Sequence, residues 1–301
     1  MNSKNLFNAE VVNFIDPKNF TNGKILDDKT ILRYEIVKSL GGEKIVFNDG
    51  DFFYKLNTYG FRSNHFDKFK KENTNILFAG CSVTFGQGVP EDCTWTQFLS
   101  NKINDKLKYK INHYNISNPG ASIYEIIKNI LAFLNSVGTP DYIFMLLPSS
   151  SRSIKFNKKN KKFMHTGFFI LNNKIGLPKN KNLNYINKEY VKNYCHEDQV
   201  LLNITLISML EKICENKNIK LFWSSWDPED LYFYEQINFK NKISLLKELN
   251  NYNIISKDNC DSFCKNNEIK YWESSRDGIH PSSHWHFHLA NIFFNGLNFD
   301  E

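Results

Sequence analysis

From residue 75 onward, short apolar segments alternate with longer segments whose apolar residues recur every three or four positions. The short segments have the length and the aliphatic or aromatic content of buried strands, and they are 75–79 (NILFA), 111–116, 142–147 (YIFMLL), 219–225 (IKLFWSS) and 268–272. The longer segments are expected to be helices, and they are 94–107, 122–137, 198–217, 229–250 and 282–297. Strands that alternate with helices indicate a parallel sheet covered on both faces. We therefore expect a three-layer α/β/α sandwich on a parallel five-stranded sheet, as in flavodoxin-like folds.

Two regions depart from this alternation. Residues 1–74 are expected to form a β-rich extension, with a tight-turn signal at 48–50 (NDG) between two strand-like segments. The stretch 152–196 is polar and rich in Lys and Asn, and a hairpin is expected within 163–176 (FMHTGFFILNNKIG). The sequence thus predicts an N-terminal β extension and one domain over 75–301 that carries an insertion at 152–196.

The composition is that of a folded protein. Of the 301 residues, 41% are hydrophobic and 23% are charged, which excludes a disordered chain. The longest apolar run, 142–147, is far shorter than the roughly twenty residues that cross a bilayer. The N-terminus shows no apolar stretch followed by a small-residue cleavage site. We expect no membrane span and no secretory signal, which favours a cytoplasmic location.

The net charge of +6 raises the question of a nucleic-acid partner. The one dense basic stretch, 155–162 (KFNKKNKK), is interpreted as a solvated loop, with a patch for an anionic polymer as the alternative. No zinc-finger, RNA-recognition or helix-turn-helix signature accompanies it, so no nucleic-acid partner is expected. The six cysteines form no CxxC pair, which favours free thiols in a reducing compartment, although their even number leaves disulfides open.

Three loops that follow predicted strands carry chemically suggestive residues, at the sheet edge where open parallel sheets hold their active sites. The loops are 80–89 (GCSVTFGQGV), 118–122 (NPGAS) and 276–281 (RDGIHP). Ser82 stands on a strand-to-helix turn that should lift its hydroxyl into the open, and Gly120 can turn a backbone N–H toward it. Asp277 and His280 can meet, so that the carboxylate fixes the imidazole tautomer and the other ring nitrogen accepts the serine proton.

These loops resemble the sequence blocks of the SGNH/GDSL hydrolases. GCSVTFGQGV, with TW at 94–95, is similar to their nucleophile block, and NPGAS is similar to their glycine block. DGIHP, followed by His284 and Ala290, is similar to their closing Asp-x-x-His block. Residues 57–62 (NTYGFR) resemble the N-x-x-GFR lead-in of many members. The likeness covers roughly residues 57–148 and 219–297 and leaves the insertion out.

The resemblance implies an SGNH hydrolase-like fold and a catalytic triad. Ser82 would be the nucleophile, His280 the general base and Asp277 its orienting partner. The N–H groups of Ser82 and Gly120 would supply part of the oxyanion hole. We expect no cofactor and no metal ion at this site.

Two positions depart from the pattern of the family. Cys81 stands where the family usually has an Asp that supports the turn, so catalysis is expected to survive the change. Ser150 stands where the third block, Gly-x-Asn-Asp, usually places the Asn that binds the oxyanion. Removal of one oxyanion donor typically costs about 10²–10³ in rate. Either the Ser150 hydroxyl or the Arg152 guanidinium could take its place, and Ser150 is therefore included in the predicted oxyanion hole.

Simpler interpretations exist for several of these residues. Ser82 could merely cap the following helix, and Cys81 could be the nucleophile in its place. His284 and His288 share a helical face, but no carboxylate stands at a matching spacing, which favours packing or site lining over a metal ion. Among the tryptophans, Trp226 follows a predicted strand and is the better platform for a substrate. The side chains expected to line the substrate site are those of Arg152, Trp226 and His284.

Taken together, the motifs predict a serine esterase that works through an acyl-enzyme. The expected partner is a small-molecule or carbohydrate ester with a small acyl group such as acetyl, which the resemblance favours over long-chain lipids. The same triad would serve an acyltransferase, and the sequence specifies no oligomeric state. The competing class is a binding module that kept the pocket but lost its catalytic turnover when it lost the oxyanion-binding Asn. A third, weaker alternative is a phosphodiester or nucleic-acid enzyme, which only the net charge suggests. The joint presence of Ser82, Asp277 and His280 favours the esterase.

Overall fold

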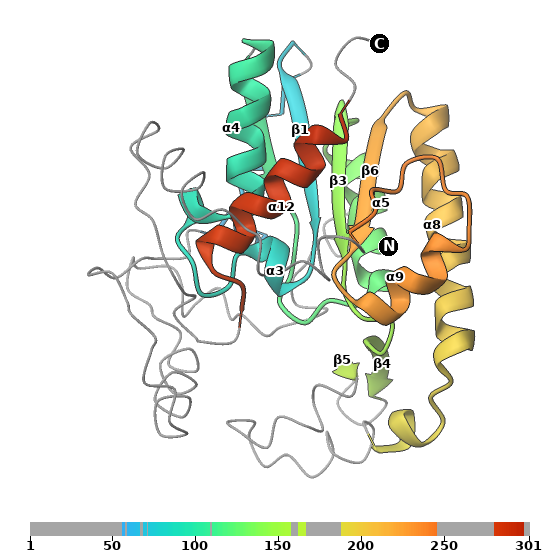
Figure 1. Ribbon diagram of the computed structural model, residues 1–301. Helices are drawn as coiled ribbons and strands as arrows, with labels where there is room; N and C mark the ends of the chain where they lie inside the picture. Colours follow the sequence, from blue (N-terminus) through green and yellow to red (C-terminus); the bar gives the residue numbers. More distant parts are fainter. Residues whose placement is uncertain are drawn as a thin grey trace, which may run out of the picture.

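Four parallel strands form the centre of the structure (Figure 1). The strands are β1 (Thr74–Gly80), β2 (Ile111–Asn115), β3 (Tyr142–Leu147) and β6 (Lys220–Ser225), in the order β2-β1-β3-β6. The computed structural model describes residues 56–57, 59–66, 69–70, 72–108, 110–157, 162–166, 188–245 and 280–297. The fifth strand expected at 268–272 lies outside these residues.

β1 and β3 are the central strands and are buried along almost their whole length. β1 pairs with β2 from Thr74 opposite Ile111, and with β3 from Ile76 opposite Tyr142. Their unbroken apolar runs are typical of parallel strands covered on both faces. Because the four strands are parallel, their carboxyl ends meet at one edge of the sheet, and the loops that follow them converge there.

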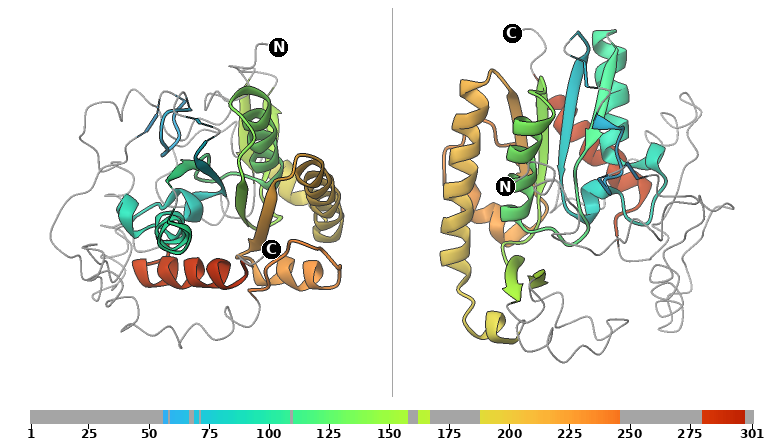
Figure 2. Two further views of the ribbon diagram at one scale, coloured as in Figure 1. Left: turned by 90° about the horizontal axis from the view of Figure 1, so that it is seen from above. Right: turned by 180° about the vertical axis from the view of Figure 1, so that it is seen from behind.

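Helices cover both faces of this sheet (Figure 2). One face is covered by α4 (Trp95–Leu107) and α12 (Ser283–Asn295), and the other by α5 (Ile123–Ser136) and α8 (His196–Asn216). The side-chain oxygens of Thr94 and Ser122 cap the first N–H groups of α4 and α5. The prediction of a three-layer α/β/α sandwich on a parallel sheet is confirmed.

Aromatic rings join the sheet to the α4–α12 layer. The Phe144 ring of β3 lies 5.5 Å from Phe78 of β1, 5.5 Å from Phe222 of β6 and 5.9 Å from Phe293 of α12. Trp95, the first residue of α4, stacks on Phe293 at 5.0 Å and meets Phe78 edge-on at 5.4 Å. Edge-on and offset ring contacts add to the free energy of apolar burial, so this cluster is the centre of the core.

A two-stranded antiparallel hairpin lies beyond the carboxyl ends of the sheet (Figure 1). It pairs β4 (Ser153–Asn157) with β5 (Lys162–Thr166). Of the hairpin expected within 163–176, only residues 163–166 are described, and they pair with β4, which precedes them; residues 167–176 lie outside the described part of the chain. Part of the basic stretch 155–162, expected as a solvated loop, is therefore strand. The segment SIKFN alternates polar and apolar residues, which is the period of a strand.

Of the segment 229–250, expected as a helix, residues 229–245 are described, and these are helical only at their start. α9 (Pro228–Glu235) ends early, and the chain then runs beside the outer edge of β6. The Trp223 N–H donates to the Asn241 carbonyl at 3.1 Å, and the Ile243 N–H donates to the Trp223 carbonyl at 2.8 Å. A continued helix would leave these backbone groups of β6 without these partners. Residues 246–279, and residues 1–55 of the predicted extension, lie outside the described part of the chain.

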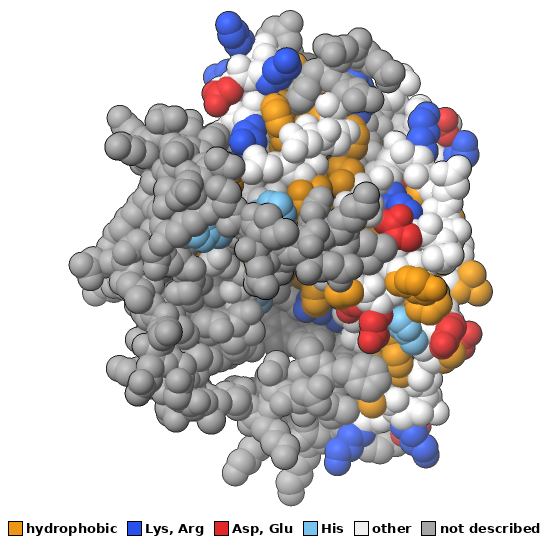
Figure 3. All heavy atoms as spheres, in the orientation of Figure 1, with side chains coloured by type: hydrophobic (Ala, Val, Ile, Leu, Met, Phe, Trp, Pro, Cys, Tyr) orange, Lys and Arg blue, Asp and Glu red, His pale blue; other side chains and the backbone are white. Residues whose placement is uncertain are grey.

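The described surface has no single dominant charge on the face drawn in Figure 3. Lys and Arg side chains are spread over separate places and alternate there with Asp and Glu side chains. Within the described residues, none of the helices is long and apolar enough to cross a membrane. The described cysteines, Cys81, Cys93, Cys195 and Cys214, are free thiols.

The aromatic cluster yields a stability prediction. Phe144→Ala should lower the free energy of unfolding by about 3–5 kcal/mol, because it empties a site surrounded by rings. Tyr124→Ala on α5 is the control: its side chain is 57% exposed, so the loss should stay within about 0.5 kcal/mol. Urea unfolding of both variants measures the difference. A Phe144→Ala loss as small as that of the control would contradict the account of the core.

Candidate active site

Ser82, the predicted nucleophile, is the first residue of α3 (Ser82–Phe85). Only Cys81 separates it from the end of β1, so the strand passes into the helix through a sharp turn. Gly80 is needed there because a Cβ atom would lie 2.0 Å from Thr84 Oγ1 and 2.9 Å from the Leu146 carbonyl oxygen. Ser82 is 5% exposed. Its hydroxyl therefore lies in an enclosed site. The sequence had suggested that the turn would lift it into the open.

A buried arginine, Arg62, fixes the chain that follows α3. Its Nη1 atom donates to the carbonyl oxygens of Phe85, Gly86 and Val89 at 3.2, 2.8 and 3.1 Å. Gly86 ends α3 with a φ of 76°, the left-handed conformation that favours glycine. Hydrogen bonds from a permanently charged guanidinium are stronger than those between neutral groups. Arg62 thus holds in place the backbone that follows Ser82 and α3. The sequence did not reveal this role.

The motif that precedes Arg62 is a hydrogen-bonded turn. Asn57 Oδ1 accepts from the N–H groups of Tyr59 and Phe61 at 3.0 and 3.1 Å. The Asn57 N–H in turn donates to the Phe61 carbonyl at 2.8 Å. Gly60 has a φ of 81°, which explains the glycine of this motif. The lead-in motif therefore sets the position of Arg62.

The loop after β2 is tied directly to the nucleophile turn. The Asn118 N–H donates to the Gly80 carbonyl at 3.2 Å, and Asn115 Nδ2 donates to the Thr84 carbonyl at 2.8 Å. Gly120 follows with a φ of 80°. The sequence placed Ser82 and Gly120 on neighbouring loops, and these two hydrogen bonds hold those loops together.

The backbone N–H groups of Ser82 and Gly120 donate no hydrogen bond to any residue in the described part of the chain. Ser82 begins a helix, whose first N–H groups have no partner inside the helix. Gly120 lies in a turn between β2 and α5. Two N–H groups on joined loops, both without such a partner, have the donor capacity that an oxyanion requires.

Beside Ser82, three side chains contact one another in sequence: Cys81, Trp226 and Arg152. The Cys81 Sγ atom is 4.0 Å from Ser82 Oγ and accepts from Trp226 Nε1 at 3.4 Å. The Arg152 guanidinium carbon lies 5.2 Å from the centre of the Trp226 ring, a cation–π distance. Of the three predicted substrate-lining residues, Arg152 and Trp226 are thus brought together next to the nucleophile turn.

Ser150 is completely buried and is held by Asp230 of α9. Its N–H donates to Asp230 Oδ2 at 2.5 Å, and its hydroxyl donates to Asp230 Oδ1 at 2.6 Å. A serine hydroxyl has one proton. In this arrangement that proton is already donated, and it is not directed at an oxyanion. The Tyr194 hydroxyl, 3.2 Å from Ser150 Oγ, is then the donor of that contact.

His280 lies three residues before the start of α12. Asp277, its predicted partner, lies outside the described residues. His284 is half-buried in the first turn of α12. Within the described residues, no group of three or more His, Cys, Asp or Glu side chains is arranged to hold a metal ion.

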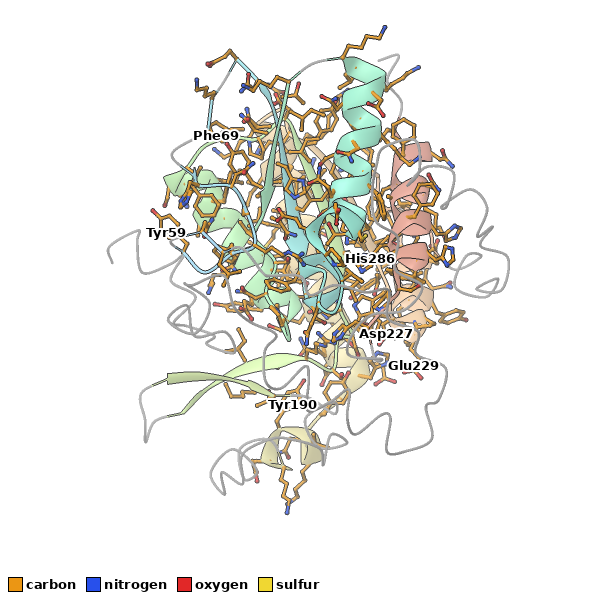
Figure 4. The ribbon with its side chains drawn as sticks, turned by 90° about the vertical axis from the view of Figure 1, so that its left-hand side faces the viewer. Tyr59, Phe69, Tyr190, Asp227, Glu229 and His286 are labelled. Atoms are coloured by element: carbon orange, nitrogen blue, oxygen red, sulfur yellow. The ribbon has the colours of Figure 1, made fainter. Side chains whose placement is uncertain are left out.

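His286, which Figure 4 labels, joins α12 to the first residue of α4. Its Nδ1 atom accepts from the Trp95 N–H at 3.1 Å, which requires a neutral ring. Burial, together with the charges of Arg62 and His280, lowers the pKa of His286 to about 3. His286 therefore stays neutral through the physiological range.

No family model and no curated protein matches the chain. Solved structures do match. A psychrotrophic esterase, EstA, from Pseudoalteromonas sp. is 12% identical with a TM-score of 0.40, over 74% of this chain and 96% of that one. An acetyl xylan esterase, AlAXEase, is 13% identical with a TM-score of 0.41, over 74% and 100%. A putative lipolytic protein of the G-D-S-L family from Desulfitobacterium hafniense DCB-2 is 12% identical with a TM-score of 0.33, over 75% and 100%.

This chain is similar in structure to GDSL-family esterases and lipases. The likeness is one of fold, since the identities are low.

The neutral state of His286 predicts a pH dependence of stability. The folded pKa lies below the unfolded value of 6.5, so stability is lost as the pH falls from about 6.5 toward 3. His286→Asn keeps an acceptor for the Trp95 N–H but cannot titrate. Between pH 6 and 4 the free energy of unfolding should fall less steeply in this variant, by up to about 1.4 kcal/mol per pH unit.

Urea unfolding at a series of pH values measures these slopes. His65→Asn, at an exposed position, is the control and should keep the wild-type slope. His113, whose pKa burial lowers to about 4, contributes equally to all three proteins. Equal slopes for wild type and His286→Asn would contradict a buried neutral His286.

Proposed function

We propose that this protein is a serine esterase with Ser82 as nucleophile, His280 as general base and Asp277 as the partner that orients His280. The observation that carries the proposal is the pair of N–H groups, on Ser82 and Gly120, that have no hydrogen-bond partner in the described part of the chain and lie on joined loops. A serine on a sharp strand-to-helix turn beside such donors is suited to acyl transfer.

In the proposed reaction, Ser82 Oγ attacks the ester carbonyl while His280 takes its proton. The negative charge that develops on the carbonyl oxygen is stabilised by the N–H groups of Ser82 and Gly120. His280 then gives the proton to the leaving alcohol, and an acyl-enzyme remains on Ser82. Water, activated by His280, hydrolyses this intermediate and restores the free serine.

The third oxyanion donor is proposed to be Arg152. Ser150, the other candidate, donates its hydroxyl proton to Asp230 and is completely buried. Arg152 follows on the same loop and stacks on Trp226, whose indole N–H contacts Cys81 next to the nucleophile. A guanidinium also carries the positive charge that an oxyanion favours.

The proposed substrate is an ester of a small acyl group, such as acetyl, on a carbohydrate or another polar alcohol. A cavity of about 500 Å³ is lined by residues of β4 and of the segment 189–202, including Lys155, Tyr190, Tyr194 and Asp198. One lining residue, Tyr190, contacts the loop that follows β3, since its hydroxyl donates to the Ser151 carbonyl at 3.1 Å. Donors, acceptors and aromatic faces together suit an alcohol with several hydroxyl groups.

A binding module without turnover is the second candidate, and one observation favours it. No amide side chain stands in the 148–152 loop, where the related hydrolases place the Asn that binds the oxyanion. If Arg152 does not replace that donor, the rate should fall by about 10²–10³. An acyltransferase would use the same triad and differ only in the acceptor of the second step.

A fluorophosphonate probe tests the proposed nucleophile. Ser82→Ala should abolish labelling and the release of p-nitrophenol from p-nitrophenyl acetate. Cys81→Ala should keep most of both, because its thiol accepts a hydrogen bond from Trp226 and is not the attacking group.

Two outcomes would count against the proposal. If Cys81→Ala is the inactive variant, the thiol is the nucleophile. If the wild type releases no p-nitrophenol in a Ser82-dependent way from acetyl or longer-chain esters, the binding module becomes the better account.

A further inference from the structure

Asp230 is a fully buried carboxylate at which three segments of the chain meet. Its Oδ2 atom accepts from the Ser150 N–H, and its Oδ1 atom accepts from both the Ser150 hydroxyl and His196 Nε2, at 2.6 and 2.8 Å. Ser150 belongs to the loop after β3, His196 begins α8, and Asp230 lies in α9 after β6. A single side chain thus joins the loop to both helices.

Burial of the Asp230 carboxylate lowers the stability of the fold unless the carboxylate is fully hydrogen-bonded. Burial raises the pKa of Asp230, and the hydrogen bonds from Ser150 and His196 act in the opposite direction. A buried charge that loses one partner is strongly destabilised. The carboxylate therefore holds Ser150 in one position, with two bonds to the same residue that fix both its backbone and its side chain.

The loop that Asp230 holds is the one that carries Arg152. The Arg152 N–H donates to the Ser149 carbonyl at 3.1 Å, so the loop is a closed turn with Ser150 at its centre. Arg152 stacks on Trp226, which stands four residues before Asp230. Asp230 therefore holds the loop of Arg152 through Ser150, and it lies in the helix that follows Trp226.

We propose that Asp230, supported by His196, is a positioning residue that holds the 148–152 loop so that Arg152 faces the oxyanion formed at Ser82. In this chain Arg152, positioned by this Asp230–Ser150 latch, takes the role of the missing amide of the third block. The proposal rests on the proposed esterase function. It differs from a purely structural role because Asp230 then acts on the rate only through Arg152.

A double-mutant cycle separates the two roles. Arg152→Ala should lower kcat for p-nitrophenyl acetate by about 10²-fold with little change in KM. Asp230→Asn should lower kcat about tenfold or more, because small misplacements of a catalytic group cost that much. In the Arg152→Ala background, Asp230→Asn should add less than about twofold. Additive effects would overturn the proposal.

Asp227→Asn is the matched control. Asp227 caps the same helix with bonds to the N–H groups of Glu229 and Asp230, and Asn is an equally good cap. It should keep the wild-type kcat. If Asp230→Asn does not fold, Ser150→Ala replaces it, since it removes one of the two bonds to Asp230 and should give a smaller, equally non-additive loss.

An NMR measurement that does not depend on catalysis tests the Asp230–Ser150 latch separately from the esterase function. The Arg152 Nε–H resonance, assigned by its loss in Arg152→Lys, should carry a ring-current shift from Trp226. That shift should disappear in Asp230→Asn and persist in Asp227→Asn. A shift retained in Asp230→Asn would overturn the latch whatever the activity. A shift that disappears in a protein with no Ser82-dependent turnover would support the latch and refute the esterase.

Discussion

The parallel pairing of β1 between β2 and β3 is the constraint on which the rest of the structure depends. It places Gly80, Asn115 and Leu147 at one edge of the sheet, and the chain must leave all three strands at that edge. Gly80 shows how tightly the edge is packed, since a Cβ atom there would meet the Leu146 carbonyl oxygen at 2.9 Å. This pairing brings Ser82, Gly120 and the 148–152 loop to one edge of the sheet, and the hydrogen bonds from Asn118 and Asn115 then join the first two loops.

Two charged side chains then fix loops that the sheet alone leaves adjustable. Arg62 binds three carbonyl oxygens of the chain after α3, and Asp230 binds both polar groups of Ser150. Both side chains are buried, and both groups use several hydrogen bonds to one short segment. A charged group is expensive to bury, so its bonds must all be formed for the fold to be stable. Such anchors suit a site whose donors must stay in place while charge develops.

Most of the fold could be predicted from the sequence because its strands are buried on both faces. The apolar run at 142–147 coincides with β3, and the segments at 75–79 and 219–225 differ from β1 and β6 by one or two residues. The segment 229–250 could not be predicted in the same way, because residues 241–243 pair with β6 instead of continuing a helix. Its conformation depends on the free edge that β6 would otherwise have, and β6 is distant in the sequence, so the local sequence pattern does not indicate it.

The site was predictable to the same extent and for related reasons. Ser82 and Gly120 lie in short motifs whose glycines are required by the local backbone, so the sequence shows them directly. Arg62 lies in the short motif 57–62 and Asp230 in no motif, but the sequence shows the role of neither, since their partners lie 23 to 27 and 80 residues away. Ser150 was predicted as an oxyanion donor because its hydroxyl was considered without Asp230.

The most direct test of the account is to locate the acyl group during turnover. The protein is mixed with p-nitrophenyl acetate, quenched with acid and digested, and the acetylated peptide is fragmented in a mass spectrometer. We expect the acetyl group on the Ser82 oxygen. Its amount should be larger in the wild type than in Arg152→Ala, and larger at low temperature, where deacylation is slow. Acetylation of Cys81, or steady turnover with no acetyl group on Ser82, would contradict the account.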